Sequence, residues 1–281
     1  MKKENIAIEI CGLGKKYDGF ELSIPKLSVE KGQCIGLIGE NGAGKSTLIK
    51  LMLQLVEKDS GEIFIFGNAV ISKQRKKEIS VVFDSNSYNG DLTINELNII
   101  LNGIFGERWD EKKYFNQVIE NGLPREKKIE SFSLGMKAKL NIIIAFSHNP
   151  RMLILDEATS NLDPVVRIEI NNIIKHYIED TGCTVVFSSH IVNELEEIAD
   201  RLLFLHKGKI ALDTTPYRLR NDYRLIKVKD KMAISGDVVA IVSDGEGYVC
   251  LTDNVDDYEM EIVKQGVSTG EVLYYLAKGV Q

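Results

Sequence analysis

Residues 39–46 read Gly39-Glu40-Asn41-Gly42-Ala43-Gly44-Lys45-Ser46, which matches the pattern G-x-x-x-x-G-K-[ST] at every fixed position. An apolar run at residues 35–38 comes directly before it, as a buried parallel strand would. After it, apolar residues recur on one face of a predicted helix, at Leu48, Ile49, Met52, Leu53 and Val56. The alternative is a glycine-rich turn that matches by chance, but the flanking strand and helix favour a phosphate-binding loop.

The glycines of this loop predict how its backbone binds phosphate. Gly39, Gly42 and Gly44 let the backbone adopt φ values that a Cβ atom would forbid, so successive N–H groups can point at phosphate oxygens. The N-terminal end of the helix that begins near Lys45 adds free N–H groups and a positive dipole end. We expect the rest of the loop to bind nucleotide as well, through Glu40, Asn41 and Ala43.

The side chains at the end of the loop predict contacts to a triphosphate and its metal ion. Lys45 can reach the β- and γ-phosphates, and the Ser46 hydroxyl can bind Mg²⁺. Thr47 is the next expected phosphate contact. The sequence therefore predicts a nucleotide site with Lys45 among its catalytic groups.

Composition limits the possible function classes. The chain has 281 residues, of which 44% are hydrophobic, and a net charge of −6 argues against a mainly electrostatic grip on nucleic acid. Its four cysteines are far apart, so disulfide or metal use is not expected. We find no N-terminal signal sequence and no apolar stretch of membrane-spanning length. If the protein acts at a membrane, another chain must supply the spans.

Periodicity predicts alternating strands and helices, interrupted by one block that contains helices alone. Strands are expected at residues 6–10, 20–29, 62–67 and 79–83, and Tyr17 falls in a predicted loop. A block at about residues 85–148 reads as helical, with helices at 94–105, at 110–121 and from Ser133 to the residues before Pro150. The α/β pattern then resumes with strands at 152–155 and 184–187, and a helix that begins at Pro164 lies between them. The block looks like an inserted helical subdomain.

Three predicted strands end in polar residues, namely at Gly39, at Asp156-Glu157 and at Ser189-His190. Because ligands bind at the carboxyl ends of strands in an open α/β sheet, we expect these residues to converge. Asp156 is then placed to hold Mg²⁺, and Glu157 to act as the general base toward water. His190 can donate a hydrogen bond to the γ-phosphate. The alternatives are a solvated carboxylate and a structural histidine.

Two further features are weaker when taken alone. Tyr17 could lie flat on an adenine ring, although such an aromatic residue more often packs on the surface. Ser133 and Gly135 begin a predicted helix and could form a second anion site, although a serine commonly only caps a helix.

With these motifs in this order, residues 1 to about 215 resemble the ATP-binding subunit of an ATP-binding-cassette (ABC) transporter. The resemblance implies a P-loop ATPase core with an N-terminal antiparallel β subdomain and the inserted helical subdomain. It implies that Tyr17 stacks on adenine and that Ser160-Asn161-Leu162-Asp163 form the family's D-loop. It also implies a dimer, homo- or heteromeric, closed head-to-tail around two ATP molecules. Ser133 and Gly135 would then reach the γ-phosphate of the opposite subunit.

The chain departs from the family pattern at two points. The signature reads Phe132-Ser133-Leu134-Gly135-Met136 where the family usually has L-S-G-G-Q. Asp84 stands where a glutamine usually follows the strand, and its carboxylate could meet Mg²⁺ or the attacking water. Both changes resemble cassettes that power ABC-2-type exporters. That resemblance implies a separate membrane-spanning permease and a peripheral, cytoplasmic location on the inner face of the cell membrane.

Residues 216–281 fit the family less well. Predicted strands near 224–228, 238–242 and 248–251, followed by a helix after Ser268, indicate a small α+β lobe. It is either regulatory or dimer-stabilising, or a structural extension without its own activity.

The main competing hypothesis is a non-transport ABC ATPase that acts on nucleic acid or the ribosome. A DNA-repair type would need a long coiled coil between Ser46 and Ser133, and that segment is too short. Ribosome-acting relatives typically carry two cassettes, and this chain has one. A GTPase switch would need an N-K-x-D motif, which the sequence lacks. The sequence therefore favours transport, with no nucleic-acid partner.

Overall fold

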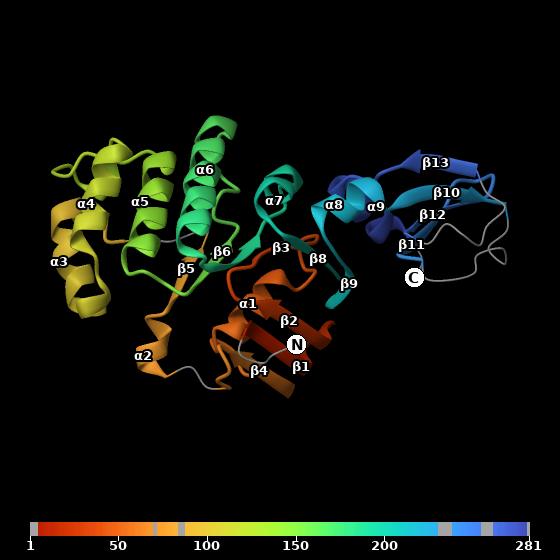
Figure 1. Ribbon diagram of the computed structural model, residues 1–281, viewed down its shortest axis with the longest axis horizontal. Coiled ribbons are helices and arrows are strands. Elements are labelled where there is room, and N and C mark those ends of the chain that lie inside the picture. Colours follow the sequence, from red (N-terminus) through yellow and green to blue (C-terminus); the bar gives the residue numbers. More distant parts are fainter. Residues whose placement is uncertain (1–4, 70–71, 84–87, 230–237, 254–260, 280–281) are drawn as a thin grey trace.

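A six-stranded sheet lies at the centre of the computed structural model, which describes residues 5–69, 72–83, 88–229, 238–253 and 261–279 (Figure 1). Its strand order is β5-β6-β7-β3-β8-β9, and only β9 runs antiparallel to its neighbour. The strands are β3 (Cys34–Ile38), β5 (Ile79–Phe83), β6 (Met152–Asp156), β7 (Thr184–Ser188), β8 (Arg201–His206) and β9 (Lys209–Thr214).

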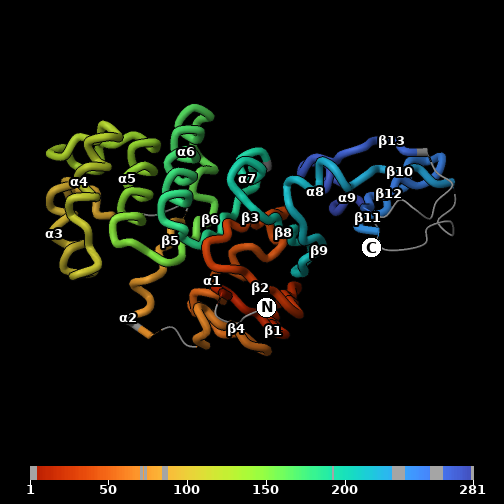
Figure 2. The backbone as a smooth tube through the Cα atoms, viewed as in Figure 1, coloured from red at the N-terminus to blue at the C-terminus, as the bar shows by residue number. Residues whose placement is uncertain are grey.

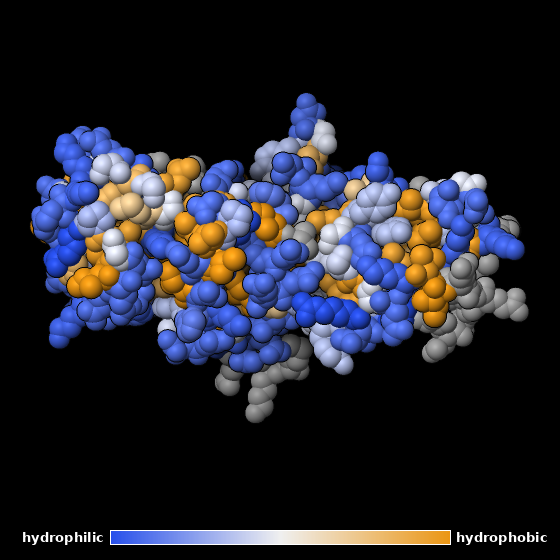
Figure 3. Space-filling view, turned by 90° about the horizontal axis from the view of Figure 1, so that it is seen from above, coloured by the Kyte–Doolittle hydropathy of each residue, from blue (hydrophilic) through white to orange (hydrophobic). Residues whose placement is uncertain are grey.

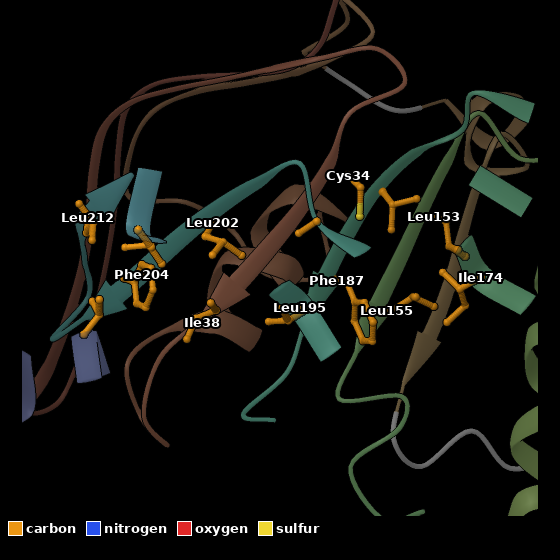
Figure 4. Packing of buried hydrophobic residues seen from close by; sticks show 14 of the residues in the cluster. Cys34, Ile38, Leu153, Leu155, Ile174, Phe187, Leu195, Leu202, Phe204 and Leu212 are labelled. Atoms are coloured by element: carbon orange, nitrogen blue, oxygen red, sulfur yellow. The ribbon is translucent and has the colours of Figure 1, made fainter. Parts of the chain in front are cut away.

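This sheet is buried on both faces, which explains why its strands read as continuous apolar runs. Every residue of β3, β6 and β7 is buried. On one face Leu155 and Phe187 lie side by side and Phe204 lies further along the sheet in the same hydrophobic cluster (Figure 4). The helices α5 (Leu134–Ser147), α6 (Pro164–Thr181) and α7 (Val192–Ile198) complete that layer. On the other face Ile154 and Val186 pack against α1 (Lys45–Met52) and a second sheet. The carboxyl ends of β3, β6 and β7 thus share one edge.

The second sheet is antiparallel and has the order β2-β1-β4, with β1 (Ile6–Tyr17), β2 (Phe20–Glu30) and β4 (Ser60–Ile65). The first strand is longer than predicted, because the expected loop after residue 10 continues as β1. Gly12 has a φ of 60°, and the pairing with β4 shifts register between Cys11 and Gly14. This bulge lets the strand pass through its glycines, so Tyr17 ends a strand instead of lying inside a loop.

Three helices form a separate hydrophobic cluster at one end of the molecule (Figure 1). They are α3 (Ile94–Phe105), α4 (Glu111–Glu120) and the outer side of α5. Thr93 and Glu96 form the predicted capping box, and Asp110 caps α4. The Trp109 indole N–H donates to the Asn98 side-chain oxygen at 2.8 Å. Within the described ranges, no helix is long and apolar enough to cross a membrane.

The C-terminal residues form a four-stranded antiparallel sheet with the order β11-β12-β10-β13, at the opposite end of the chain trace (Figure 2). Val272 and Leu276 of the last helix share one core cluster with Leu195 and Leu202 beside the central sheet. The strands are β10 (Arg224–Val228), β11 (Ala240–Ser243), β12 (Tyr248–Thr252) and β13 (Glu261–Gln265), and the helices are α8 (Pro216–Asn221) and α9 (Thr269–Lys278).

The predicted α/β class is confirmed, since a mainly parallel sheet combines with helices, an N-terminal antiparallel sheet, a helical cluster and a small C-terminal α+β lobe. Among the α-helices and strands of the described residues, three short elements were not predicted: α2 (Lys73–Lys76), α8 and β13. Thr215 caps α8 and Pro216 begins it, so a start signal for this helix was present in the sequence. The described side chains of β13 are exposed, from Ile262 to Gln265, so this strand lacks the alternation that identifies a half-buried strand.

Candidate functional site

The loop from Gly39 to Gly44 turns the chain from β3 into α1. Gly42 and Gly44 have φ values of 83° and 110°, as predicted for this loop. Gly39 does not have a positive φ, so the special backbone conformation predicted for it was wrong. A Cβ atom there would lie 2.5 Å from the carbonyl oxygen of Leu205 and 3.0 Å from the Ala43 Cβ. Gly39 is therefore required for space, while the other two glycines provide the backbone conformation.

Lys45 is the first residue of α1, and its side chain is only 6% exposed. Its Nζ donates to the carbonyl oxygen of Gly39 at 2.6 Å and lies 3.6 Å from Glu157 Oε1. No side chain caps the N-terminus of α1, where Gly44 is the cap residue. The first N–H groups of the helix and one ammonium group are thus available on the same side of the loop.

Asp156 ends β6 opposite Ser188, the last residue of β7. The Ser188 hydroxyl donates to Asp156 Oδ1 at 2.6 Å, and the Ser46 hydroxyl lies 3.5 Å from the same oxygen. Among the described residues, no group of three or more His, Cys, Asp or Glu side chains could hold a metal ion. A carboxylate beside a hydroxyl is nevertheless a set of hard oxygen ligands that fits Mg²⁺, whose remaining positions are usually taken by water and substrate phosphates.

Glu157 has an unusual backbone conformation, with a φ of 55°. Its N–H donates to the carbonyl oxygen of Ser188 at 3.1 Å, which fixes this turn at the end of the sheet. Its Oε2 lies 2.6 Å from His190 Nδ1, and the His190 side chain is 54% exposed. Strained residues of this kind cluster at functional sites when the surrounding structure holds them in place.

Most of these groups line one open cleft of about 720 Å³, whereas the predicted residues Gly39, Ala43 and Asp156 do not line it. Of the residues predicted from the sequence, Glu40, Asn41, Gly42, Gly44, Lys45, Ser46, Thr47, Glu157 and His190 line it. Gly19, Phe20, Ser160 and Asn161 line it as well. Phe20 was not predicted as a site residue, although an aromatic residue directly after the Gly19 turn was a visible signal.

Some predicted site residues lie away from this cleft. Tyr17 is exposed and does not line it, and its ring stacks on Phe20 with a centroid distance of 6.4 Å. Ser133 and Gly135 start α5 and do not line the cleft of their own chain. The Ser133 hydroxyl accepts a hydrogen bond from the Met136 N–H at 3.2 Å. Asp84, predicted as a possible metal ligand, lies outside the described residues.

Comparisons with known proteins show which family the chain resembles. Residues 22–160 match the family described as ABC transporter. The bacitracin transport ATP-binding protein BcrA of Bacillus licheniformis is 35% identical over 218 residues, which make up 75% of this chain and 70% of that protein. The lantibiotic transport ATP-binding protein SrtF of Streptococcus pyogenes is 33% identical over 207 residues, or 73% of this chain and 90% of that protein.

A solved structure gives the same result for the fold. A subunit of an ABC transporter complex from Clostridium perfringens aligns with a TM-score of 0.67 at 22% identity. The alignment covers 76% of this chain and 90% of that subunit. At this level of identity the likeness concerns the fold alone.

Proposed function

This chain belongs to the family of ABC transporter ATP-binding subunits, in which ATP hydrolysis is coupled to transport, and on that premise we propose that the described cleft is its hydrolysis site. The observation that carries the proposal is the position of Glu157. Its Oε1 lies 3.6 Å from Lys45 Nζ, and its Oε2 lies 2.6 Å from His190 Nδ1. Three separate strand ends supply these three groups. The arrangement brings a phosphate-binding cation, a base and a hydrogen-bond donor together.

Each group has a defined task when ATP binds. The loop N–H groups and Lys45 hold the β- and γ-phosphates, and Glu157 accepts a proton from the attacking water. His190 is placed to donate a hydrogen bond to the γ-phosphate. Ser46 and Asp156 hold Mg²⁺, which neutralises charge on the phosphate oxygens when bound. Asp84 remains a candidate for a further contact, and Tyr17, with Phe20 beside it, for stacking on the adenine.

A second subunit completes the site in this proposal. Ser133 and Gly135 do not line the cleft of their own chain, and the neighbouring Leu134 is exposed at the same helix start. The N-terminus of a helix attracts anions through its free N–H groups. Two chains arranged head-to-tail would let these residues reach the γ-phosphate of the partner, so that ATP holds the dimer together.

The outer face of α3 is the proposed contact with the membrane permease. Three isoleucines are exposed there, Ile99 at 71%, Ile100 at 45% and Ile104 at 52%. An exposed apolar group on one helix is a common mark of a protein interface. On the face of the molecule seen in Figure 3, hydrophobic residues form several patches among hydrophilic ones. The chain would then lie on the cytoplasmic face of the membrane through its permease.

Export is the direction that this proposal favours. The relatives above are named for bacitracin transport and lantibiotic transport. We infer a toxic compound of comparable kind as the cargo, which a growth assay can test. Cells that lack this chain should become more sensitive to bacitracin or to a lantibiotic, and unchanged sensitivity to both would remove the inference about cargo.

The proposal also divides the chain by task. Residues 1–215 would carry the ATPase, with the helical part at about 85–148 facing the permease, and residues 216–281 would form an accessory lobe. The competing idea of an ATPase that acts on nucleic acid or the ribosome gains no support from the relatives above.

The test of the hydrolysis site is the variant Glu157→Gln. It keeps the size of the side chain but removes the base, so we expect hydrolysis to fall by about 100-fold or more while ATP still binds. Bound and unhydrolysed ATP should then trap a dimer, which light scattering would detect. A variant that hydrolyses ATP at the parent rate, or stays monomeric in saturating Mg-ATP, would contradict the proposed roles.

A further inference from the structure

A buried carboxylate lies beneath the cleft and has no role in the proposed chemistry. It belongs to Glu194 on α7, whose side chain is 3% exposed. Thr159 donates its hydroxyl hydrogen to this carboxylate, at 3.0 and 2.9 Å from its two oxygens. The Ser189 hydroxyl donates to Oε1, and the Asn171 amide lies 3.3 Å from Oε2. Glu194 does not line the cleft itself.

The first partner of Glu194 belongs to the turn that carries Glu157. Thr159 follows Glu157 by two residues and is fully buried. Ser160, the next residue, closes the turn by donating its hydroxyl to the carbonyl oxygen of Glu157 at 2.8 Å. On the far side of the turn, Arg167 donates to the carbonyl oxygen of Leu162 at 2.8 Å. The hydrogen bond from Thr159 therefore joins this whole turn to α7.

The second partner belongs to the loop that carries His190. Ser189 donates to Glu194 and accepts a hydrogen bond from the Ile191 N–H at 2.9 Å. These two residues flank His190 on either side. The conformation of the loop at His190 is thus fixed by a hydroxyl group that the carboxylate orients.

The chemistry of this cluster favours an orienting role over simple packing. Hydrogen bonds to an ionised acceptor are stronger and more directional than neutral ones, and burial strengthens them further. Leu195, the next residue along α7, is fully buried in the main core cluster and could attach the helix by itself. A well-packed helix does not need a buried carboxylate for stability, because burying a charge carries a desolvation cost. Two of the three donors to Glu194, the hydroxyls of Thr159 and Ser189, come instead from the two segments that meet at the cleft, and the third, the Asn171 amide, comes from α6.

We propose that Glu194 is a positioning residue that sets the distance between Glu157 and His190 by holding both of their loops. It acts through Thr159 on one side and through Ser189 on the other. The inference rests on the roles proposed above for Glu157 and His190. It adds that the turn carrying Glu157 and the loop carrying His190 move as one unit, since the same carboxylate binds both.

The first test is Glu194→Gln in the full-length chain. The amide keeps the size of the side chain but has one acceptor oxygen for two hydroxyl donors, so one loop is released. We expect kcat for ATP hydrolysis to fall by about tenfold, less than the roughly hundredfold loss that a 1 Å misplacement can cause. The dissociation constant for ATP should stay within about twofold, because no contact to the nucleotide is removed.

The matched control is Glu197→Gln, which makes the same chemical change at an exposed position of the same helix. Its kcat should equal that of the parent. Equal losses in the two variants would overturn the proposal, as would a Glu194→Gln variant whose ATP affinity weakens as much as its kcat. Rates are expressed per nucleotide bound, so that a misfolded fraction does not count as slow chemistry.

Thr159→Val keeps the inference testable if Glu194→Gln fails to fold. It removes one hydroxyl at nearly constant volume and should lower kcat in the same way, again with unchanged ATP affinity. Where both single variants fold, the double variant should lose little more than either alone, because both break the same connection. Additive losses would show that the two residues act separately and would contradict the proposal.

Glu157→Gln separates the failure of this inference from failure of the proposed function. If that variant is inactive while Glu194→Gln and Thr159→Val keep the parent kcat, only the positioning role is wrong. If Glu157→Gln itself keeps full activity, the hydrolysis site is wrong and the positioning role is lost with it.

Discussion

The ammonium group of Lys45 is held between a carbonyl oxygen and a carboxylate. It donates to Gly39 at 2.6 Å and lies 3.6 Å from Glu157, inside a largely buried environment. A charge in such a place needs partners because its hydration is lost. Phosphate oxygens would offer this cation a stronger anionic partner than Glu157 does, so binding of ATP would release the carboxylate to face the attacking water.

The variant Lys45→Ala tests whether the Lys45 ammonium group binds the phosphates of ATP. Hydrogen bonds to charged groups contribute about 1.5–3 kcal/mol, so we expect ATP affinity to fall by roughly 10- to 100-fold. Titration calorimetry measures the change directly. Lys50→Ala is the matched control, because Lys50 is exposed on the same helix and should leave the affinity unchanged. Unchanged binding by Lys45→Ala would contradict its position at the phosphates.

At this scale the sequence predicted residues that belong to a local motif and missed those that depend on tertiary contacts. The loop and the residues at the strand ends follow from spacing, so Lys45 and Glu157 were predicted. The steric requirement for glycine at position 39 was not predicted, because only the pairing of β3 with β8 brings the carbonyl group of Leu205 close to it. Glu194 reads as one more charge on an amphipathic helix until the fold buries it.

Among the elements, α3 combines a strong local signal with an unusual surface. Its capping box fixes the N-terminus, and Leu97 and Leu101 attach it to the helical cluster. Ile99 lies on the opposite side of the helix and Ile104 at the margin of the packed side, and both side chains are exposed to solvent. An isolated domain gains nothing from these exposed side chains, whereas burying one isoleucine against a partner would contribute about 1.5–3 kcal/mol.

Ile104→Asp tests the proposed permease contact. Binding to vesicles that contain the membrane-spanning partner should weaken by about 10-fold or more. ATP hydrolysis by the isolated chain should stay within about twofold of the parent, because α3 does not line the cleft. Asn102→Asp serves as the control, since it adds the same charge on α3 without removing apolar surface. Parent-like vesicle binding by Ile104→Asp would place the permease contact elsewhere.

The elements that the sequence missed share a physical explanation. β1 passes through glycines that normally signal a loop, and its pairing with β2, which continues as far as Tyr17, keeps it extended. β13 is exposed along its described residues and is recognised as a strand only by its hydrogen bonds to β10. Long helices with caps and buried apolar strands were predicted because their signals are local. Short or fully exposed elements depend on partners far away in the sequence.

Across the whole molecule, α7 connects the site to the C-terminal sheet. Glu194 and Glu196 are two residues apart, so their side chains leave the helix about 200° from each other. Glu194 faces the cleft loops, while Glu196 binds the start of α9 and an arginine of α8. It accepts a hydrogen bond from the Thr269 N–H at 3.0 Å and one from the Thr269 hydroxyl, and Arg220 lies 3.3 Å away. The C-terminal lobe is therefore held by the helix that also orients the histidine loop.

The ionisation of Glu196 makes this attachment dependent on pH. Burial acts to raise the pKa of Glu196, but the hydrogen bonds from Thr269 and the ion pair with Arg220 outweigh it and hold the pKa below its ordinary value of 4.5. A carboxyl group with a lowered pKa stabilises the folded state above its unfolded pKa, and that contribution disappears as pH falls through the folded value. The loss should begin near pH 4.5 and continue below it.

Glu196→Gln measures how much of the stability depends on that charge. At pH 7 we expect the free energy of unfolding to fall by roughly 1 kcal/mol, a figure reduced for the partial exposure of the side chain. The difference between variant and parent should shrink as urea unfolding is repeated from pH 7 down to about pH 4, because the parent loses the charge that the variant never had. Glu197→Gln, exposed on the same helix, should match the parent throughout. A difference that stays constant with pH would mean that shape and packing, not the carboxylate charge, hold the C-terminal lobe to α7.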